Sequence, residues 1–128
     1  MMLISLIDDD PLYQFFIKKQ LENSGIPNRL LQFHDGQEAL EYFTSNQAYA
    51  ENLPDLILLD INMPYIDGWQ FLDEIEKLEL AKNNMKIYVV SSSNSSSDQQ
   101  KATTYNYLSG YLRKPLTTER FLNIITTQ

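Results

Sequence analysis

Short hydrophobic runs alternate along this chain with longer segments in which hydrophobic residues recur every three or four positions. The first pattern predicts buried β-strands and the second predicts amphipathic helices. Strands are predicted at 2–8, 29–34, 55–60, 86–91 and 110–114, and helices at 11–25, 35–46, 69–80, 95–106 and 117–128. This alternation predicts an α/β fold, a doubly wound parallel sheet with helices on both faces.

Local signals support the ends of the first two predicted helices. Pro11 lies in the first turn of the first helix, Asp10 is its natural N-cap, and Gly25 follows its last turn. Asp35 caps the second helix, with Glu38 three residues later, close to the pattern of a capping box. We therefore interpret Asp10 as a helix cap.

The composition is that of an ordinary globular domain, since 43% of the 128 residues are hydrophobic and 21% are charged. This length predicts a single domain over 1–128, and we expect no fused output domain because the last predicted helix ends the chain. Cysteine is absent, which excludes disulfides and thiolate metal sites. The formal net charge of −7 disfavours nucleic acid and anionic membranes as partners. Without an export signal or an apolar run of bilayer length, a cytoplasmic protein is the default expectation.

Polar residues follow the predicted strands and carry most of the candidate chemistry. Asp8 and Asp9 come at the end of the first strand, Asp60 ends the third, Ser91 the fourth and Lys114 the fifth. In a doubly wound parallel sheet, ligands bind beyond the carboxyl ends of the strands. We therefore expect these five side chains to share one cleft.

Three carboxylates in one cleft raise one another's pKa, and a divalent cation removes this conflict. Oxygen ligands without His or Cys suit Mg²⁺, with Mn²⁺ as the second choice. A carboxylate is also a nucleophile toward phosphorus, while lysine and serine side chains bind phosphoryl oxygens. The set supplies the positioning and charge neutralisation that phosphoryl transfer needs.

Four motifs follow the first, third, fourth and fifth predicted strands in order. They are LIDDDP (6–11), DLILLDINMPYIDG (55–68), VVSSS (89–93) and GYLRKP (110–115). Each is weak alone, but together the motifs are highly specific, and through them the chain resembles the response-regulator receiver domain of two-component signalling. The resemblance runs nearly end to end and implies a CheY-like, flavodoxin-like sheet of strand order 2-1-3-4-5.

The resemblance, carried over position by position, implies that Asp60 is the phosphoacceptor. It also implies a Mg²⁺ site in which Asp9 binds the metal directly and Asp8 binds it through water. Asn62, two residues past the acceptor, matches the position whose backbone carbonyl is a metal ligand in the family. The reactive residue is therefore expected outside the acidic run at 8–10.

Further positions match groups that respond to phosphorylation in the family. Ser91 matches the hydroxyl residue that moves to the phosphoryl group, and Lys114 matches the lysine that pairs with it, often before a cis bond to proline. Tyr111 matches the aromatic residue that turns inward, although plain packing explains a tyrosine there equally well. The run of serines leaves open whether Ser91 or Ser92 is the switch residue. Ser91 is preferred because it directly follows the hydrophobic residues YVV.

The chain departs from the family pattern before its last strand. The segment from Ser91 to Lys114 is slightly longer than the common family spacing, and YNYLSG replaces the usual Gly-Ala. Other conspicuous residues have structural interpretations. We interpret Trp69 and the aromatic residues of YQFF as packing, and His34 as a structural or solvated residue.

The resemblance implies a stand-alone phosphorelay response regulator, not an enzyme. Its partner would be a sensor histidine kinase or a histidine phosphotransfer protein, and it would catalyse only its own phosphorylation and dephosphorylation. Phosphorylation would change the surface of 95–106, 110–114 and 117–128. That surface would bind a downstream protein or form a homodimer.

A haloacid-dehalogenase-like phosphohydrolase with an Asp nucleophile is the alternative. Those enzymes have two Asp separated by one residue after the first strand, whereas Asp60 follows the third strand and Asn62 replaces the second Asp. A flavin or nucleotide binder fits less well, because no Gly-rich phosphate loop follows the first strand.

Overall fold

Five parallel strands form one sheet in the computed structural model, which describes residues 1–93 and 95–127. The strands are β1 (Met2–Ile7), β2 (Asn28–Phe33), β3 (Leu56–Leu59), β4 (Lys86–Ser91) and β5 (Gly110–Arg113). The helices are α1 (Pro11–Asn23), α2 (Gly36–Ser45), α3 (Gly68–Glu76), α4 (Ser96–Ala102) and α5 (Thr118–Thr126), with a short 3-10 helix, η1 (Ala50–Asn52). The strand order is β2-β1-β3-β4-β5, which confirms the order implied by the resemblance.

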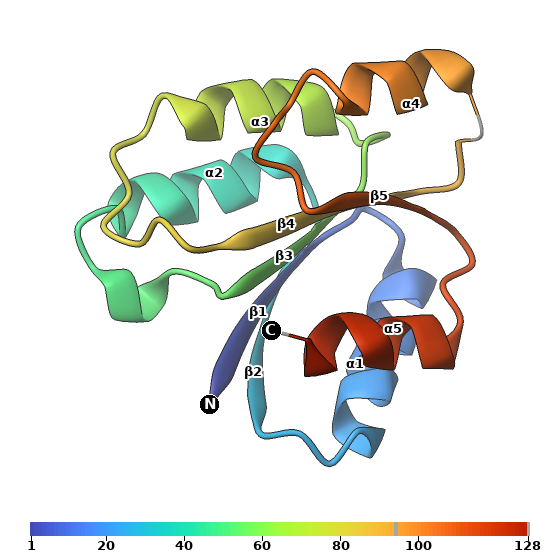
Figure 1. The fold of residues 1–128 in the computed structure, drawn as a ribbon. Helices are drawn as coiled ribbons and strands as arrows, with labels where there is room; N and C mark the ends of the chain where they lie inside the picture. The colour runs from blue at the N-terminus through green and yellow to red at the C-terminus, as the bar shows by residue number, and fades with distance from the viewer. Residues whose placement is uncertain (94, 128) are drawn as a thin grey trace.

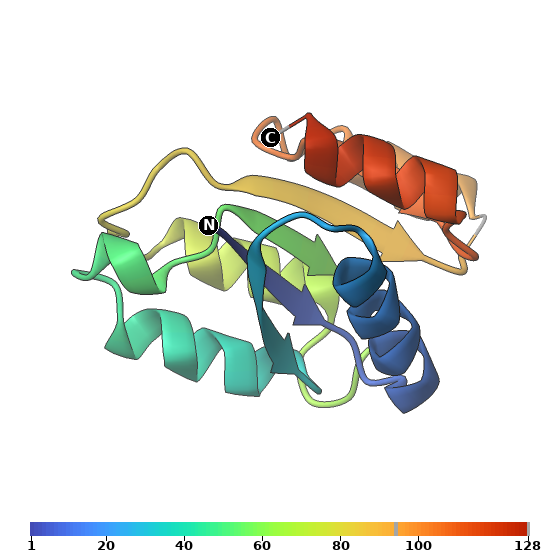
Figure 2. The ribbon, with the colours of Figure 1, turned by 90° about the horizontal axis from the view of Figure 1, so that it is seen from below.

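Helices cover the sheet on both sides. Helices α2 and α3 lie side by side on one face, with α4 on the same side (Figure 1). Helices α1 and α5 pack on the opposite face, as Figure 2 shows from below. The predicted doubly wound α/β fold is therefore confirmed, and all five strands end at the same edge of the sheet.

Each face of the sheet has its own hydrophobic core, because side chains along a strand point alternately to opposite faces. On β3, Ile57 and Leu59 pack against α2 and α3, while Leu56 and Leu58 pack toward α1 and α5. All four side chains are at most 1% exposed, as expected for a central parallel strand. The two cores hold the ends of β1 and β3 in a fixed relation.

Several predicted helices are shorter in the structure. The helix predicted at 69–80 ends at Glu76, where tighter backbone bonds to the third preceding carbonyl close its last turn. The helix predicted at 95–106 covers only Ser96–Ala102, and all seven residues are partly or fully exposed. A helix without a buried face gains little from the core, so it ends early. The last helix ends at Thr126, and Gln128 lies outside the described residues.

The predicted cap of α2 forms, but the complete capping box lies on α3 instead of α2. The Asp35 carboxylate accepts the N–H of Glu38 at 2.8 Å, as predicted, but the Glu38 carboxylate accepts from the N–H of His34. The complete capping box is on α3, where Asp67 and Gln70 each accept the other's backbone N–H. This box anchors the start of α3 just after the loop that follows β3.

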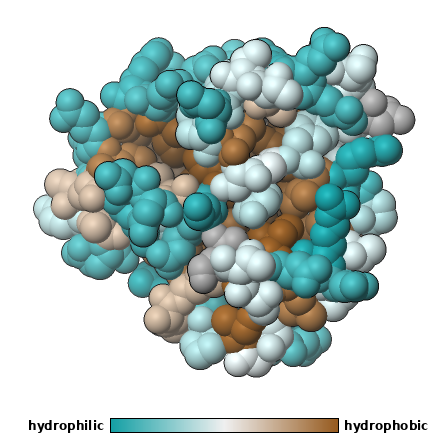
Figure 3. All heavy atoms as spheres, in the orientation of Figure 1, coloured by the Kyte–Doolittle hydropathy of each residue, from teal (hydrophilic) through white to brown (hydrophobic). Residues whose placement is uncertain are grey.

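Hydrophilic side chains cover much of the surface in Figure 3, with hydrophobic atoms visible between them. The large hydrophobic side chains that are exposed include Leu12, Phe15, Tyr49 and Tyr65. Over the residues that the structure describes, no helix is both long and apolar enough to cross a bilayer.

Candidate functional site

Three carboxylates gather at the carboxyl edge of the sheet, as the strand ends predicted. Asp8 and Asp9 follow β1, and Asp60 follows β3. Each contributes one carboxylate oxygen to a group in which these atoms lie within 4.8 Å of one another. Asp8 and Asp60 are 1% and 7% exposed, whereas Asp9 is exposed to solvent. The cluster is therefore largely buried and opens to solvent at Asp9.

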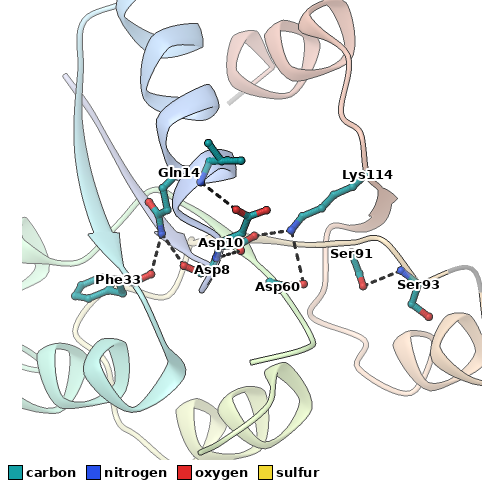
Figure 4. A network of polar contacts seen from close by, with 9 residues as sticks. Asp8, Asp10, Gln14, Phe33, Asp60, Ser91, Ser93 and Lys114 are labelled. Carbon is teal, nitrogen blue, oxygen red and sulfur yellow. Dashed lines mark hydrogen bonds and ion pairs between the residues drawn. The ribbon is translucent and has the colours of Figure 1, made fainter. Parts of the chain in front are cut away.

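Backbone hydrogen bonds position the two buried acids. The Asp8 N–H donates to the carbonyl of Phe33 at 3.1 Å, and the Asp60 N–H donates to the carbonyl of Ile7 at 2.9 Å. Both bonds extend the parallel ladder one residue past the strands. The N–H of Asp10 donates to Asp8 Oδ1 at 2.9 Å, and the Asp10 carboxylate caps α1, as predicted (Figure 4).

Lys114 reaches this cluster from the end of β5 (Figure 4). Its Nζ donates to Asp8 Oδ2 at 2.7 Å and lies 4.0 Å from Asp60 Oδ1. Its backbone N–H donates to the carbonyl of Ser91 at 2.9 Å, and its peptide bond to Pro115 is cis, as the resemblance implied. Only 17% of the Lys114 side chain is exposed, so the ammonium is paired with carboxylates in a largely desolvated space.

The two buried acids hold their protons more tightly than free carboxyl groups do. Burial raises the pKa of Asp60 to about 6, and the carboxylates of Asp8 and Asp9 add to the rise. The Lys114 ammonium and the N–H of Asn62 oppose that rise. Burial likewise raises the pKa of Asp8, against hydrogen bonds from Lys114 and a backbone N–H. A cation bound among these carboxylates would favour their charged forms and oppose both rises.

Gln14 ties the end of β1 to the end of β2. Its side-chain amide donates to the carbonyls of Asp8 at 3.0 Å and Phe33 at 2.9 Å (Figure 4). Its amide oxygen accepts from Gln32 at 2.9 Å. The Gln14 side chain is 3% exposed, so these bonds satisfy a buried amide. They also fix the backbone of Asp8, the first of the three clustered acids.

The loop between β4 and α4 is held by two predicted switch residues. Ser91 is fully buried, and its Oγ accepts the N–H of Ser93 at 3.1 Å (Figure 4). The Tyr111 hydroxyl donates to the carbonyl of Ser93 at 3.0 Å. Ser93 Oγ in turn donates to the Asp98 carboxylate of α4 at 2.6 Å. Ser92 is exposed, so Ser91 is the serine that faces inward.

The loop after Asp60 folds back onto the backbone beside the acid. The N–H of Gly68 donates to the carbonyl of Ile61 at 2.8 Å. A Cβ atom at position 68 would lie 2.7 Å from the Asp60 carbonyl oxygen and 2.8 Å from Ile61 Cα, which is too close. The loop also places Tyr65 in a left-handed conformation, with φ of 71°. The glycine of the motif therefore has a steric role next to the candidate acceptor.

The whole chain carries the features of a known family of signalling domains. The model of the response regulator receiver domain matches residues 4–126. The chain belongs to this receiver family. Receiver domains act in two-component signalling and interact with histidine kinases or phosphotransfer proteins.

Known relatives cover most of this receiver. It is 30% identical over 117 residues to the probable methanogenesis regulatory protein FilR2 of Methanothrix harundinacea, a match that covers 91% of this chain and 74% of FilR2. The receiver spans only 7% to 52% of the length of other curated relatives.

Solved structures of response regulators have the same fold. A two-component response regulator of Cytophaga hutchinsonii is 28% identical, with a TM-score of 0.84 over 98% of this chain and 94% of that one. The Mn²⁺-bound response regulator Rcp1 is 25% identical, with a TM-score of 0.74 over 99% of this chain and 91% of that one.

Two residues of α1 that the sequence analysis did not assign to the site lie beside it. Gln14 buttresses Asp8, and the ring of Tyr13 lies under the Lys114 ammonium, 4.2 Å from Nζ to the ring centroid. Their position in the sequence could have indicated this role, since the first turn of a helix that starts directly after two site acids must border those acids.

The pattern predicts packing for the aromatic residues of YQFF because they fit a helix face. Tyr13 and Phe16 do pack against the core, whereas Phe15 is 60% exposed, so the prediction is wrong for Phe15.

The other conspicuous residues have structural environments. Trp69 is 5% exposed and stacks on Tyr105 with 5.5 Å between ring centroids, which confirms packing. The Tyr105 hydroxyl donates to the Asp73 carboxylate of α3 at 2.8 Å. The residues YNYLSG therefore hold the segment before β5 against α3.

His34 is exposed at the end of β2.

Proposed function

We propose that Asp60 accepts a phosphoryl group from a sensor histidine kinase or a histidine phosphotransfer protein, and that this changes partner binding. The supporting observation is the environment of Asp60. Its carboxylate lies at a strand end, 7% exposed, beside two further carboxylates and within 4.0 Å of the Lys114 ammonium. That environment combines a nucleophile with groups that hold a cation and a phosphoryl group.

The residues present fit a divalent cation. All three clustered side chains offer carboxylate oxygens, the ligands that Mg²⁺ and Mn²⁺ prefer. We assign Asp9 and Asp60 to direct ligation, Asp8 to ligation through water, and the backbone carbonyl of Asn62 to the remaining protein ligand. Bound Mg²⁺ would neutralise negative charge on the carboxylates and on the phosphoryl oxygens. The related regulator Rcp1 has a Mn²⁺-bound form, which supports this assignment.

The transfer step uses Asp60 as a nucleophile. A carboxylate oxygen of Asp60 attacks phosphorus, and the bond from phosphorus to the donor's imidazole nitrogen breaks as the new oxygen–phosphorus bond forms. The leaving imidazole keeps the electron pair of the broken bond. Lys114 supplies a positive charge next to the phosphoryl oxygens, because its ammonium already lies within 4.0 Å of Asp60.

The new dianion would bias the neighbouring loop. Ser91 would turn its hydroxyl toward a phosphoryl oxygen and release the N–H of Ser93, which it now accepts. Tyr111 is bonded to the same loop residue, so its side chain would respond to that movement. The surface of α4, β5 and α5 would change and bind a downstream protein or a second copy of the chain. The chain over 1–128 would then act as one signalling receiver that catalyses only its own phosphorylation and dephosphorylation.

The test is incubation with acetyl phosphate, with and without Mg²⁺, read by intact mass. One labile phosphoryl group should appear only with Mg²⁺, and Asp60→Asn should abolish it. Asp10→Asn is the matched control, because it changes an adjacent acid, and asparagine also caps helices. A folded wild-type protein without any adduct would contradict the proposal. Continuous phosphate release from many substrates would favour the phosphohydrolase.

A second comparison addresses the switch residue. Ser91→Ala should alter the lifetime of the phosphoryl group or the response of α4, whereas Ser92→Ala should leave both nearly unchanged. The expectation follows from burial, since Ser91 is fully buried and Ser92 is exposed. The opposite ranking would assign the switch to Ser92.

A further inference from the structure

The Lys114 ammonium has a third neighbour besides the carboxylates of Asp8 and Asp60. Its Nζ lies over the face of the Tyr13 ring, 4.2 Å from the ring centroid. A cation at this distance is attracted by the negative face of the aromatic ring. Tyr13 comes from the first turn of α1, whereas Lys114 follows β5, so the contact joins two distant segments beside the acids.

Tyr13 contacts the site through its aromatic ring and not through its hydroxyl. The Tyr13 hydroxyl oxygen is buried and makes no hydrogen bond within the part of the chain that the structure describes. A buried hydroxyl without a partner destabilises the folded state. Burial, together with the nearby charges of Asp8 and Asp60, raises the pKa of the phenol, so the residue stays neutral. Its favourable contact with the site is therefore the one between the ring and Lys114.

A cavity of about 380 Å³ borders this contact. Tyr13, Phe16, Ser92, Lys114 and Pro115 are among the residues that line it. Lysine has a flexible four-carbon side chain, so an open space beside it offers other rotamers. A ring that attracts the ammonium favours the rotamer that points to the acids over those that point into the cavity.

We propose that Tyr13 is a positioning residue that holds the Lys114 ammonium at the cleft when a divalent cation takes up the charge of Asp8. Lys114 is now bonded to Asp8 at 2.7 Å, and a cation in the carboxylate cluster weakens that pair. The neutral ring keeps the ammonium in place without cancelling its charge, which then serves the phosphoryl group on Asp60. The inference rests on the proposed function, because the phosphoryl group is the partner for which Lys114 is held.

The placement of Lys114 can be tested without any phosphorylation. In protein with ¹³C-labelled lysine, the Cε protons of Lys114 should be shifted upfield by the ring, with the resonance assigned from Lys114→Met. The shift should persist in Tyr13→Phe, which keeps the ring, and disappear in Tyr13→Leu, which removes it. The measurement is made in Mg²⁺, where the ring matters most. Equal Lys114 resonances in wild type and Tyr13→Leu would overturn the proposal.

The functional consequence is read from the rate of phosphorylation by acetyl phosphate in Mg²⁺. Tyr13→Leu should slow the reaction about three- to thirtyfold, the range that corresponds to a cation–π contact. Tyr13→Phe should stay within about twofold of wild type, since the lost hydroxyl has no partner. In the Lys114→Met background, Tyr13→Leu should have no further effect, because the lysine it positions is gone.

These measurements distinguish failure of the Tyr13 proposal from failure of the proposed function. An equal loss from Tyr13→Leu with and without Lys114 would mean that the ring only packs, and would overturn the proposal. A loss in Tyr13→Phe as large as in Tyr13→Leu would assign the effect to the hydroxyl and overturn it as well. If wild type gains no phosphoryl group at all, the proposed function fails, and the lysine resonances still decide whether Tyr13 positions Lys114. Thermal unfolding of each variant controls for loss of folding.

Discussion

The Lys114 ammonium lies 2.7 Å from a carboxylate oxygen of Asp8 but 4.0 Å from Asp60, the proposed phosphoacceptor. The Lys114 ammonium thus offsets the negative charge of Asp8 and, more weakly, that of Asp60. A divalent cation at the three carboxylates draws on the same negative charge, so lysine and metal compete for Asp8. Phosphorylation would resolve the competition by giving the lysine a new anionic partner.

Lys114→Met should therefore have opposite effects on metal binding and on stability. The affinity for Mg²⁺ should rise by roughly tenfold, because a positive charge next to the site is gone. In EDTA, the free energy of unfolding should fall by about 2–4 kcal/mol, because a buried carboxylate loses its partner. Calorimetric titration and urea unfolding measure the two effects. The control Lys77→Met removes an exposed lysine paired with Glu74 and should change neither the Mg²⁺ affinity nor the free energy of unfolding. Unchanged Mg²⁺ affinity in Lys114→Met would contradict the competition between lysine and metal.

Asp60 should make the metal-free protein less stable as the pH rises. Its pKa is about 6 in the folded protein and about 4 in an unfolded chain, so between these values the folded state binds more protons. The contribution of Asp60 to stability is therefore largest below about pH 4 and is lost as the pH rises through about 6. Asp60→Asn should be more stable than wild type by about 1–3 kcal/mol near pH 7, with no advantage near pH 4.

Urea unfolding in EDTA across this range checks the prediction. Glu79→Gln, which removes an exposed carboxylate after α3, is the control and should follow wild type. Added Mg²⁺ should stabilise wild type more than Asp60→Asn, because a ligand that binds the folded state stabilises it. A pH-independent difference between Asp60→Asn and wild type would show that the charge of Asp60 is not the cause.

Gly68→Ala should disturb the site through the backbone. The new Cβ would meet the Asp60 carbonyl oxygen at 2.7 Å, and backbone atoms yield less readily than side chains. We expect a loss of about 1–3 kcal/mol in stability, together with slower phosphorylation. Gly36→Ala is the matched control, since its Cβ would meet side-chain atoms of Ile66 first, the nearest at 2.9 Å, and backbone only at 3.4 Å. Urea unfolding should rank Gly68→Ala as the more damaging; equal losses would argue against backbone crowding at Asp60.

Tyr65→Asn should stabilise the protein. Tyr65 has φ of 71° and is 86% exposed, so it bears left-handed strain without packing that offsets it. Asparagine adopts this conformation more readily than tyrosine, which predicts a gain of about 0.5–1 kcal/mol. Thermal unfolding measures the gain, and Tyr49→Asn, at an exposed tyrosine with φ of −116°, should bring none. A loss of stability in Tyr65→Asn would mean that the Tyr65 side chain makes a favourable contact in solution.

The sheet and the acidic cluster followed from local patterns. A run such as 55–60, hydrophobic on both faces, has few places in a fold other than the centre of a parallel sheet. Parallel strands end at the same edge, and Asp8 and Asp60 meet there because β1 pairs directly with β3, a neighbour relation that the family resemblance implied. The cap at Asp10 was equally local, since a carboxylate before Pro11 has the geometry of an N-cap.

The contacts that tertiary structure decides were beyond such patterns. Tyr105 lies past the end of α4 and stacks on Trp69 of α3, and periodicity within one segment carries no information about that partner. The pairing of Lys114 with Asp8, and its place on the Tyr13 ring, depend on a choice among lysine rotamers. That choice is made by neighbours far away in the sequence.

The edge strand β5 gives the site a dependence on complete folding. Asp8 and Lys114 are 106 positions apart, and β5 is a four-residue strand at the end of the sheet, where it pairs with β4. A nascent chain therefore contains its acids well before it contains the lysine, and the proposed acceptor site would be complete only when the last strand docks. In the folded protein, brief detachment of this short edge would remove the lysine and leave the acids in place. The proposed acceptance of a phosphoryl group would thus depend on a short strand at the edge of the sheet.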